Sequence, residues 1–282
     1  MQDFVYQTSP MLVVFGTGTV TLVADEVARL GIKRALVFST PPQRVQAERI
    51  AQLLGPFLAG VFSRAVVHTP ISVTEEAMKA MRDLNADGIV AVGGGATTGI
   101  GKAVALRSGL LQVVLPTTYA GSEMTPILGE THNGIKTTQS SSAVLPETVI
   151  YDVDLTLSMP PRLSALSGLN AMAHAVEALY ARDRNPVVSL MAGEAITKLA
   201  QALPDVCARP DEKSSRFNAF MARGYAEFAW ATSAWRSTTN SVTPWVGCST
   251  CHTPRPMRYC CRTQSPTTRR PRRMQWRSYR GH

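Results

Sequence analysis

Through the first 157 residues, short runs of apolar residues alternate with longer segments in which apolar and polar residues recur at helical spacing. The apolar runs predict strands and the amphipathic segments predict helices. The predicted strands are residues 12–16, 34–40, 87–95 and 110–116, and the predicted helices are residues 20–30, 43–54 and 98–107. A further helix is predicted near residue 72, where Ser72 or Thr74 can cap it and where Glu75 and Glu76 would fall in its first turn. This alternation predicts parallel βαβ units with right-handed crossovers.

The pattern changes near Pro160, after which no further strand is predicted. Three helical stretches follow one another, at residues 164–181, 186–202 and 211–229, and from residue 230 onward no period of 2 or 3.6 is present. We therefore predict three parts, an α/β domain at residues 1–157, the start of a helical domain at 158–229 and an aperiodic tail at 230–282. The predicted fold class is α/β, with an N-terminal parallel-sheet domain followed by an all-helical C-terminal domain that is incomplete here.

Composition narrows the class of protein. The chain has 282 residues, of which 45% are hydrophobic and 17% are charged, so wholesale disorder is excluded. No apolar run approaches the ~20 residues that a membrane helix needs. The first ten residues also lack the basic region that opens a signal peptide. We expect a cytoplasmic protein with no membrane partner.

The formal net charge of +9 is unevenly distributed. Residues 1–229 carry 19 Lys and Arg against 20 Asp and Glu, whereas residues 230–282 carry ten Arg and no acidic residue. The basic excess therefore says nothing about the partner of the main body. A non-catalytic protein whose basic tail binds nucleic acid through charge alone remains an alternative.

The first candidate site is the run Gly93, Gly94 and Gly95, which lies between a predicted strand and a predicted helix. Glycines in this position let the backbone approach a pyrophosphate closely, and the helix N-terminus favours its negative charge. The alternative is an ordinary tight turn between strand and helix. The run is not the G-x-G-x-x-G fingerprint, so an ordinary Rossmann dehydrogenase is not indicated.

A second candidate loop follows the next predicted strand, where the sequence is PTTYAGSEMT. Thr117, Thr118 and Ser122 supply hydroxyl groups, and Gly121 supplies clearance. Ligands of open α/β sheets bind at the carboxyl ends of the strands, so both loops are expected at one edge. A merely polar loop is the alternative, but two such loops on neighbouring strands favour a dinucleotide-binding domain.

The third candidate lies on the first predicted helix of the second part. Asn170, His174 and Glu177 are at i, i+4 and i+7 and share one face of that helix. Such a pair can hold one metal ion or one group of a substrate, whereas the alternative is a histidine buried in the core. His68 and His132 have no such neighbours at helical spacing, so we do not assign them to a site.

The tail contains four of the five cysteines. Those at 248 and 251 are spaced as in zinc sites, but those at 260 and 261 are adjacent and lie in a segment without structural period. We therefore do not expect the tail to bind metal.

The order of the motifs resembles the iron-containing alcohol dehydrogenase superfamily and, within it, the maleylacetate reductases. The motifs that carry the resemblance are FGTG, AVGGGATTGIGKAVAL, LPTTYAGSEMTPI, KTTQ, VIYDVDLT and SGLNAMAHAVEALYA, within residues 1–229. The resemblance implies reduction of maleylacetate to 3-oxoadipate with NADH or NADPH, in bacterial degradation of aromatic compounds, by a cytoplasmic homodimer that binds no nucleic acid. A generic metal-dependent alcohol dehydrogenase of the same superfamily is the alternative.

The resemblance also implies roles for the candidate residues. Gly93, Gly94 and Gly95 would hold the cofactor, together with Thr117, Thr118, Gly121 and Ser122. Asn170 and His174 would face the substrate as catalytic residues. Metal-dependent members usually have Asp where this chain has Asn170 and Gly99, so the resemblance predicts that no metal is needed. Ser39 and Thr40 stand where an acid usually selects NAD, so NADP is not excluded by charge.

The tail departs from the superfamily, whose members continue with more helices and a His-rich segment. Reading residues 230–257 one base out of frame permits LGNVGMALHHKLCHTLGGLFDLPHAQTH, in which the junctions at Trp230–Ala231 and Trp245–Val246 force glycine. This string looks like the missing His-rich segment. We therefore hypothesise that a one-base slip near Ala229 replaced the original C-terminal sequence.

Overall fold

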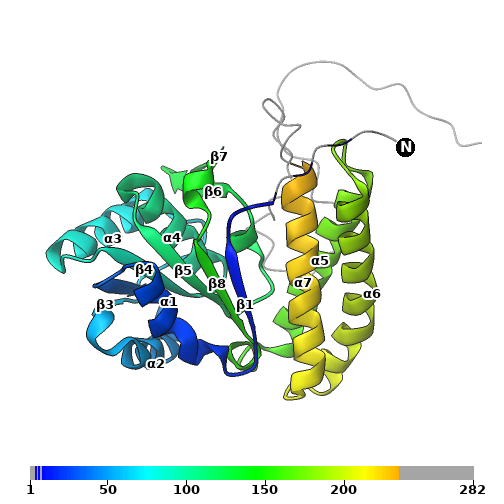
Figure 1. Ribbon diagram of the computed structural model, residues 1–282, viewed down its shortest axis with the longest axis horizontal. Coiled ribbons are helices and arrows are strands. Elements are labelled where there is room, and N and C mark those ends of the chain that lie inside the picture. Colours follow the sequence, from blue (N-terminus) through cyan, green and yellow to red (C-terminus); the bar gives the residue numbers. More distant parts are fainter. Residues whose placement is uncertain (1–3, 5, 7, 235–282) are drawn as a thin grey trace, which may run out of the picture. The chain divides into compact units, whose positions relative to one another are not determined.

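The computed structural model describes residues 4, 6 and 8–234. Its centre is a six-stranded parallel sheet with the strand order β1-β8-β5-β4-β2-β3 (Figure 1). The strands of this sheet are β1 (Leu12–Gly16), β2 (Ala35–Phe38), β3 (Leu58–Phe62), β4 (Gly88–Gly93), β5 (Leu111–Pro116) and β8 (Thr148–Asp152). Every neighbouring pair is parallel, which confirms the predicted βαβ architecture.

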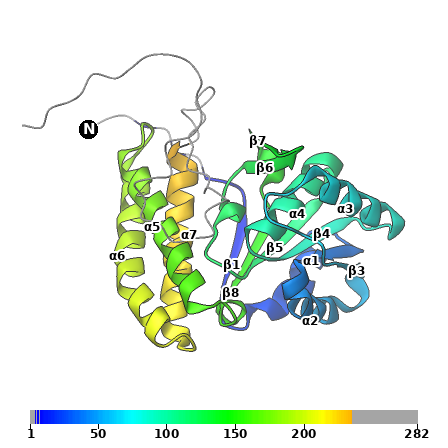
Figure 2. The ribbon, with the colours of Figure 1, turned by 180° about the vertical axis from the view of Figure 1, so that it is seen from behind.

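Helices cover both faces of the sheet (Figures 1 and 2). One face packs against α1 (Val23–Arg29) and α2 (Arg44–Leu54), and the other packs against α3 (Ile71–Asp83) and α4 (Gly95–Ser108). Because strands covered on both faces are fully buried, β4 is a continuous apolar run without polar alternation. A small antiparallel hairpin of β6 (Ile127–His132) and β7 (Ile135–Ser140) follows β5.

The start of α3 differs from the prediction. The helix begins at Ile71, directly after Pro70, and no side chain caps it. Ser72 and Thr74 therefore lie inside its first turn, and the prediction that one of them caps the helix is wrong. The buried Thr74 hydroxyl instead donates to Glu130 on β6. Pro70 itself has an extended conformation, with a φ of −60° and a ψ of 139°, and the helix begins at the next residue. The proline therefore marks the start of α3 without a polar cap.

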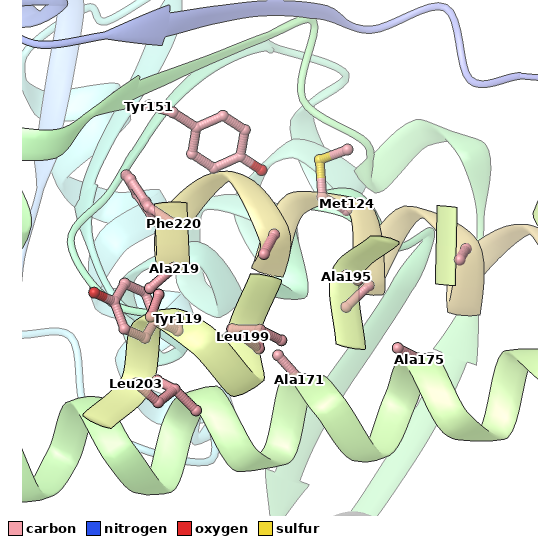
Figure 3. Close-up of a cluster of buried hydrophobic side chains, with 14 of the residues drawn as sticks. Tyr119, Met124, Tyr151, Ala171, Ala175, Ala195, Leu199, Leu203, Ala219 and Phe220 are labelled. Atoms are coloured by element: carbon pink, nitrogen blue, oxygen red, sulfur yellow. The ribbon is translucent and has the colours of Figure 1, made fainter. Parts of the chain in front are cut away.

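The second part of the chain consists of α5 (Pro161–Tyr180), α6 (Pro186–Ala208) and α7 (Lys213–Ala234), which pack against one another. Alanines dominate the contact, so the three helices approach closely (Figure 3). The same cluster includes Tyr119, from the loop after β5, and Tyr151, from β8. This shared core places α5 and α7 beside the carboxyl ends of the central strands.

α7 continues to Ala234, beyond the predicted start of the aperiodic tail at residue 230. Residues 235–282 lie outside the described part of the chain. The hypotheses about the cysteines, the arginines and the reading frame of the tail concern these residues, so the structure does not test them. Within the described part, no helix is both long and apolar enough to cross a membrane.

Candidate active site

The glycine run forms the turn between β4 and α4. Gly93 has a φ of 154°, and a Cβ there would lie 2.6 Å from Gln43 Oε1 and would clash with Thr97 Oγ1. A Cβ at Gly94 would lie 2.9 Å from Thr118 Oγ1. Gly94 also precedes α4 without any side-chain cap, so the first amides of the helix have no side-chain partner. Gly93 and Gly94 are therefore required because neighbouring side chains pack closely against the turn, and the turn leads into the positive end of a 14-residue helix.

The loop after β5 lies against this turn. Pro116 pairs with Gly93 in the sheet, and the Thr117 amide donates to the Gly93 carbonyl at 3.0 Å. Gln43 Nε2, from the segment after β2, donates to Thr117 Oγ1 at 2.6 Å. The structure therefore brings together the two loops that the sequence predicted to share an edge. Gln43, which the sequence analysis did not single out, links them to a third strand end.

The strand order places a topological switch point at this edge. β3 is added to the sheet on one side of β2, whereas β5 is added on the opposite side of β4. The direction in which successive strands are added therefore reverses between the neighbouring strands β2 and β4. Open α/β sheets bind ligands at such a switch point. The buried hydroxyls of Thr97 and Ser122 have no hydrogen-bond partner among the described residues. A helix N-terminus without a side-chain cap and unpartnered hydroxyls fit the pyrophosphate of a dinucleotide.

A buried lysine fixes the second loop. Lys102, on α4, donates to the carbonyls of Ser122, Thr125 and Ile127 and is 1% exposed. Burial lowers the pKa of Lys102 to about 7, although the charge of Glu227 opposes the shift. The glycine turn begins the same helix, so Lys102 ties the two candidate loops to one rigid element.

Two of the three candidates on α5 are neighbours in the structure. Asn170 Nδ2 lies 3.5 Å from His174 Nε2. Glu177 lies further along the helix, where it accepts a hydrogen bond from Trp230 Nε1 at 2.8 Å. The Trp230 ring stacks on the His174 ring, with 4.8 Å between their centroids. Asn170 and His174 thus lie next to each other, whereas Glu177 makes its hydrogen bond to Trp230.

The sequence analysis missed Glu227, on α7. Its Oε1 lies 2.7 Å from His174 Nδ1, and its side chain is 2% exposed. Burial lowers the pKa of His174, but the hydrogen bond and charge of Glu227, with the charge of Glu177, outweigh burial and raise that pKa above its ordinary value. The pattern did contain a hint, since Arg223 and Glu227 are four residues apart on the face of α7 that carries buried alanines.

Other buried charges surround this pair. Arg223 forms an ion pair with Glu123, which also accepts a hydrogen bond from Tyr151 Oη at 2.9 Å. Burial lowers the pKa of Arg223 to about 10, while the charge of Glu227 acts in the opposite direction. Charged groups this deeply buried in a small region are characteristic of functional sites. The candidate active site therefore lies where α5 and α7 meet the loop after β5.

Comparison with known proteins identifies the family. The iron-containing alcohol dehydrogenase model matches residues 10–153, and the C-terminal model of the Fe-containing alcohol dehydrogenase family matches residues 164–240. This chain belongs to the iron-containing alcohol dehydrogenase family. The family assignment confirms the resemblance seen in the sequence and agrees with the observed parallel sheet followed by helices.

Within the iron-containing alcohol dehydrogenases, the chain is similar to maleylacetate reductases. It is 57% identical to the maleylacetate reductase of Rhizobium sp. strain MTP-10005 over 216 residues, which are 77% of this chain and 62% of that protein. It is 52% identical to the enzyme of Sphingobium indicum over 77% of this chain and 61% of that protein. The chain thus spans a little under two thirds of the length of these relatives.

Solved structures give the same picture. The crystal structure of the Rhizobium maleylacetate reductase superposes with a TM-score of 0.80, at 53% identity, over 82% of this chain and 66% of that one. The Agrobacterium tumefaciens maleylacetate reductase superposes with a TM-score of 0.80, at 52% identity, over the same shares of the two chains.

The family assignment corrects the prediction that no metal is needed, because this family is iron-containing. That prediction rested on an amide at Asn170 in place of a carboxylate. An amide loses the negative charge but still offers an oxygen ligand, so this one position does not decide the matter. Among residues 4, 6 and 8–234, no group of three or more His, Cys, Asp or Glu side chains is placed to hold a metal ion. These residues alone therefore do not complete an iron site.

Proposed function

We propose that this protein reduces the carbon–carbon double bond of maleylacetate, giving 3-oxoadipate, with NADH or NADPH as the reductant. The observation that carries the proposal is that the glycine turn and the loop after β5 lie against each other, with the His174–Glu227 pair beside the same loop. Relatives that are 57% and 52% identical are named maleylacetate reductases, which supports the substrate.

The cofactor would lie against the glycine turn and the loop after β5. Gly93, Gly94 and Gly95 would face its pyrophosphate with the amides of the α4 N-terminus. The remaining cofactor-binding residues would be Thr117, Thr118, Gly121 and Ser122. When bound, the reduced nicotinamide supplies the hydride. No acidic side chain follows β2, where Ser39 and Thr40 stand, so both NADH and NADPH are compatible with this site.

His174 would complete the reduction by supplying the proton. Addition of hydride to the alkene carbon β to the ketone leaves an enolate, whose negative charge needs a nearby donor. His174 Nε2 is on the side of the ring opposite Glu227 and next to Asn170, so both side chains can donate toward that charge. Transfer of the Nε2 proton to the enolate carbon gives the saturated ketone and neutral His174, which solvent reprotonates.

The same proposal includes a homodimer that works in the cytoplasm, in bacterial degradation of aromatic compounds. β1 is an edge strand of the sheet, and its Leu12 and Val13 side chains are 40% and 44% exposed. Exposed apolar residues on an open strand edge are typical of a surface that another chain covers. We expect no role for nucleic acid or membranes.

A metal-dependent alcohol dehydrogenase activity is the second candidate, and the iron-containing family favours it. The two candidates differ in the bond that is reduced, a carbon–carbon double bond or a carbonyl group.

The decisive experiment follows the oxidation of NADH or NADPH with maleylacetate, and in parallel with simple aldehydes, after purification with and without added Fe²⁺. We expect slow turnover of maleylacetate by the 282-residue chain, with formation of 3-oxoadipate. A preparation that binds the dinucleotide but reduces only aldehydes would contradict the proposal and establish the alcohol dehydrogenase. Metal content measured on the same sample tells whether either activity follows bound iron.

A further inference from the structure

The carboxylate of Glu227 lies at the meeting point of three elements. It contacts His174 of α5, it occupies the space beside Gly121 in the loop after β5, and it belongs to α7. A Cβ at Gly121 would overlap the Glu227 side chain, and the φ of +77° at Gly121 also favours glycine. We propose that Glu227 is a positioning residue, which fixes the His174 ring and directs its Nε2 toward the substrate.

The hydrogen bond between the two side chains sets the tautomer of the ring. An ionised carboxylate only accepts hydrogen bonds, so the proton between Glu227 Oε1 and His174 Nδ1 belongs to Nδ1. With Nδ1 committed to Glu227, Nε2 is the ring nitrogen that lies next to Asn170 and can act on a ligand.

The charges around the pair complete the arrangement. Glu227 and Glu177 are the acidic groups that act on His174, and both favour its protonated form. Lys102 of α4 and Arg223 of α7 are buried cations that interact with the charge of Glu227. The carboxylate is therefore subject to three basic groups, one of which is the ring it orients. This environment explains why the pKa of His174 is raised although burial lowers it.

The consequence rests on the proposed function. Under that proposal, His174 Nε2 transfers its proton to the carbon of the enolate, and the electron pair of the broken N–H bond stays on Nε2. Glu227 forms and breaks no covalent bond, because it contacts only the ring and not the substrate. Without the carboxylate, the ring would lose protons at lower pH and would be free to rotate about its Cα–Cβ and Cβ–Cγ bonds.

The test compares Glu227→Gln and Glu227→Ala with the wild-type chain. Glutamine keeps the size of the side chain and an acceptor oxygen but removes the charge, whereas alanine removes both. Glu194→Gln is the matched control, since Glu194 is a 51% exposed glutamate on α6 that pairs with Lys198. Circular dichroism and thermal unfolding establish that each variant is folded.

The first readout is independent of turnover. Nitrogen-15 spectra of labelled histidine, assigned with His174→Gln, report the tautomer and the titration midpoint of His174. We expect the Nδ1-protonated form in the wild type, a lower midpoint in Glu227→Gln, and a mixture of tautomers in Glu227→Ala. An unchanged midpoint and tautomer in both folded variants would overturn the proposal, whether or not the protein reduces maleylacetate.

The second readout uses turnover where the wild type shows it. Because Glu227 raises the pKa of His174, its removal should move the alkaline limb of the kcat profile to lower pH. We expect kcat at neutral pH to fall about tenfold or more, with KM for the dinucleotide unchanged. Equal kcat profiles in wild type and Glu227→Gln would contradict the role. Absence of wild-type turnover would contradict the proposed function and leave the spectroscopic result to decide the role of Glu227.

Discussion

At the scale of single residues, the candidate site depends on where a side chain is absent as much as on where one is present. A Cβ at Gly94 would approach Thr118 Oγ1 to 2.9 Å, so this position requires glycine. Thr97 and Ser122 have buried hydroxyls without a hydrogen-bond partner among the described residues. Under the proposed function, the pyrophosphate would be bound by backbone amides and small polar residues.

We predict that Gly94→Leu abolishes NADH binding, because the added side chain fills the space against Thr118 and covers the helix N-terminus. Titration calorimetry measures the loss. Gly109→Leu is a useful control for backbone effects, since Gly109 has a positive φ, but a Cβ there meets nothing within 4 Å. Retained affinity in folded Gly94→Leu would place the dinucleotide elsewhere.

Lys102 provides a second prediction at this scale. Lys102→Met keeps the length of the side chain but leaves the carbonyls of Ser122, Thr125 and Ile127 without their donor. We expect a loss of about 1–3 kcal/mol in the free energy of unfolding and faster hydrogen exchange in the loop after β5. Lys79→Met, at a side chain that is 72% exposed, is the control and should change neither. Equal effects of the two substitutions would show that Lys102 does not anchor the loop.

Lys102 also makes the free energy of unfolding of the wild-type protein depend on pH. Its pKa is about 7 when folded and 10.5 ordinarily, so the unfolded chain binds more protons between these values. Stability contributed by this group therefore rises as pH increases from about 7 to about 10.5. Chemical unfolding at several pH values should show that rise in the wild type. Lys102→Met should lose this part of the increase, and a rise identical in both proteins would contradict it.

At the scale of elements, the sequence predicted most of the sheet because buried parallel strands are apolar runs and their helices are amphipathic. β7 was not predicted, since all six of its residues are exposed and its sequence, IKTTQS, is mostly polar. The start of α3 was misjudged because Pro70, not a polar cap, precedes it. β8 was not predicted either, although all five of its residues are buried, because its short sequence TVIYD includes a threonine and an aspartate.

The candidate site divides along the same line. The glycine turn and the loop after β5 were predictable together, since parallel strands place their ends at one edge. The pairing of Asn170 with His174 was also predictable, from spacing along one helix. Glu227 was not, because it lies 53 residues from His174 and reaches it only through the packing of α5 on α7. Alanines on both helices make that approach possible, and alanine carries no signal of what it brings together.

At the scale of the whole molecule, α5 has one face that nothing in the described part of the chain covers. Its apolar side chains are partly in solvent, with Leu166 58% exposed, Leu169 54%, Val176 43% and Tyr180 68%. These positions fall on one stripe of the helix. The curated relatives are longer, since the matched region is 62% and 61% of their length. We infer that this exposed apolar stripe promotes association between copies of the 282-residue chain.

The last prediction tests this inference together with the hypothesis of a one-base slip near Ala229. We compare the 282-residue chain with the product of a gene corrected by one base at that point, both at equal concentration. Because exposed apolar stripes promote association, we expect the 282-residue chain to form oligomers or aggregates by light scattering and to oxidise NADH with maleylacetate slowly. The corrected chain should be more soluble, unfold at higher temperature and turn over at least ~10²-fold faster, because the shifted reading adds histidines that can serve as donors beside His174.

Leu166→Glu combined with Leu169→Glu in the 282-residue chain separates association from loss of turnover, since this variant should reduce association without restoring turnover. Equal turnover by the two chains would show that residues 1–229 suffice for catalysis, and resequencing of codons 225–235 would then decide the reading frame alone.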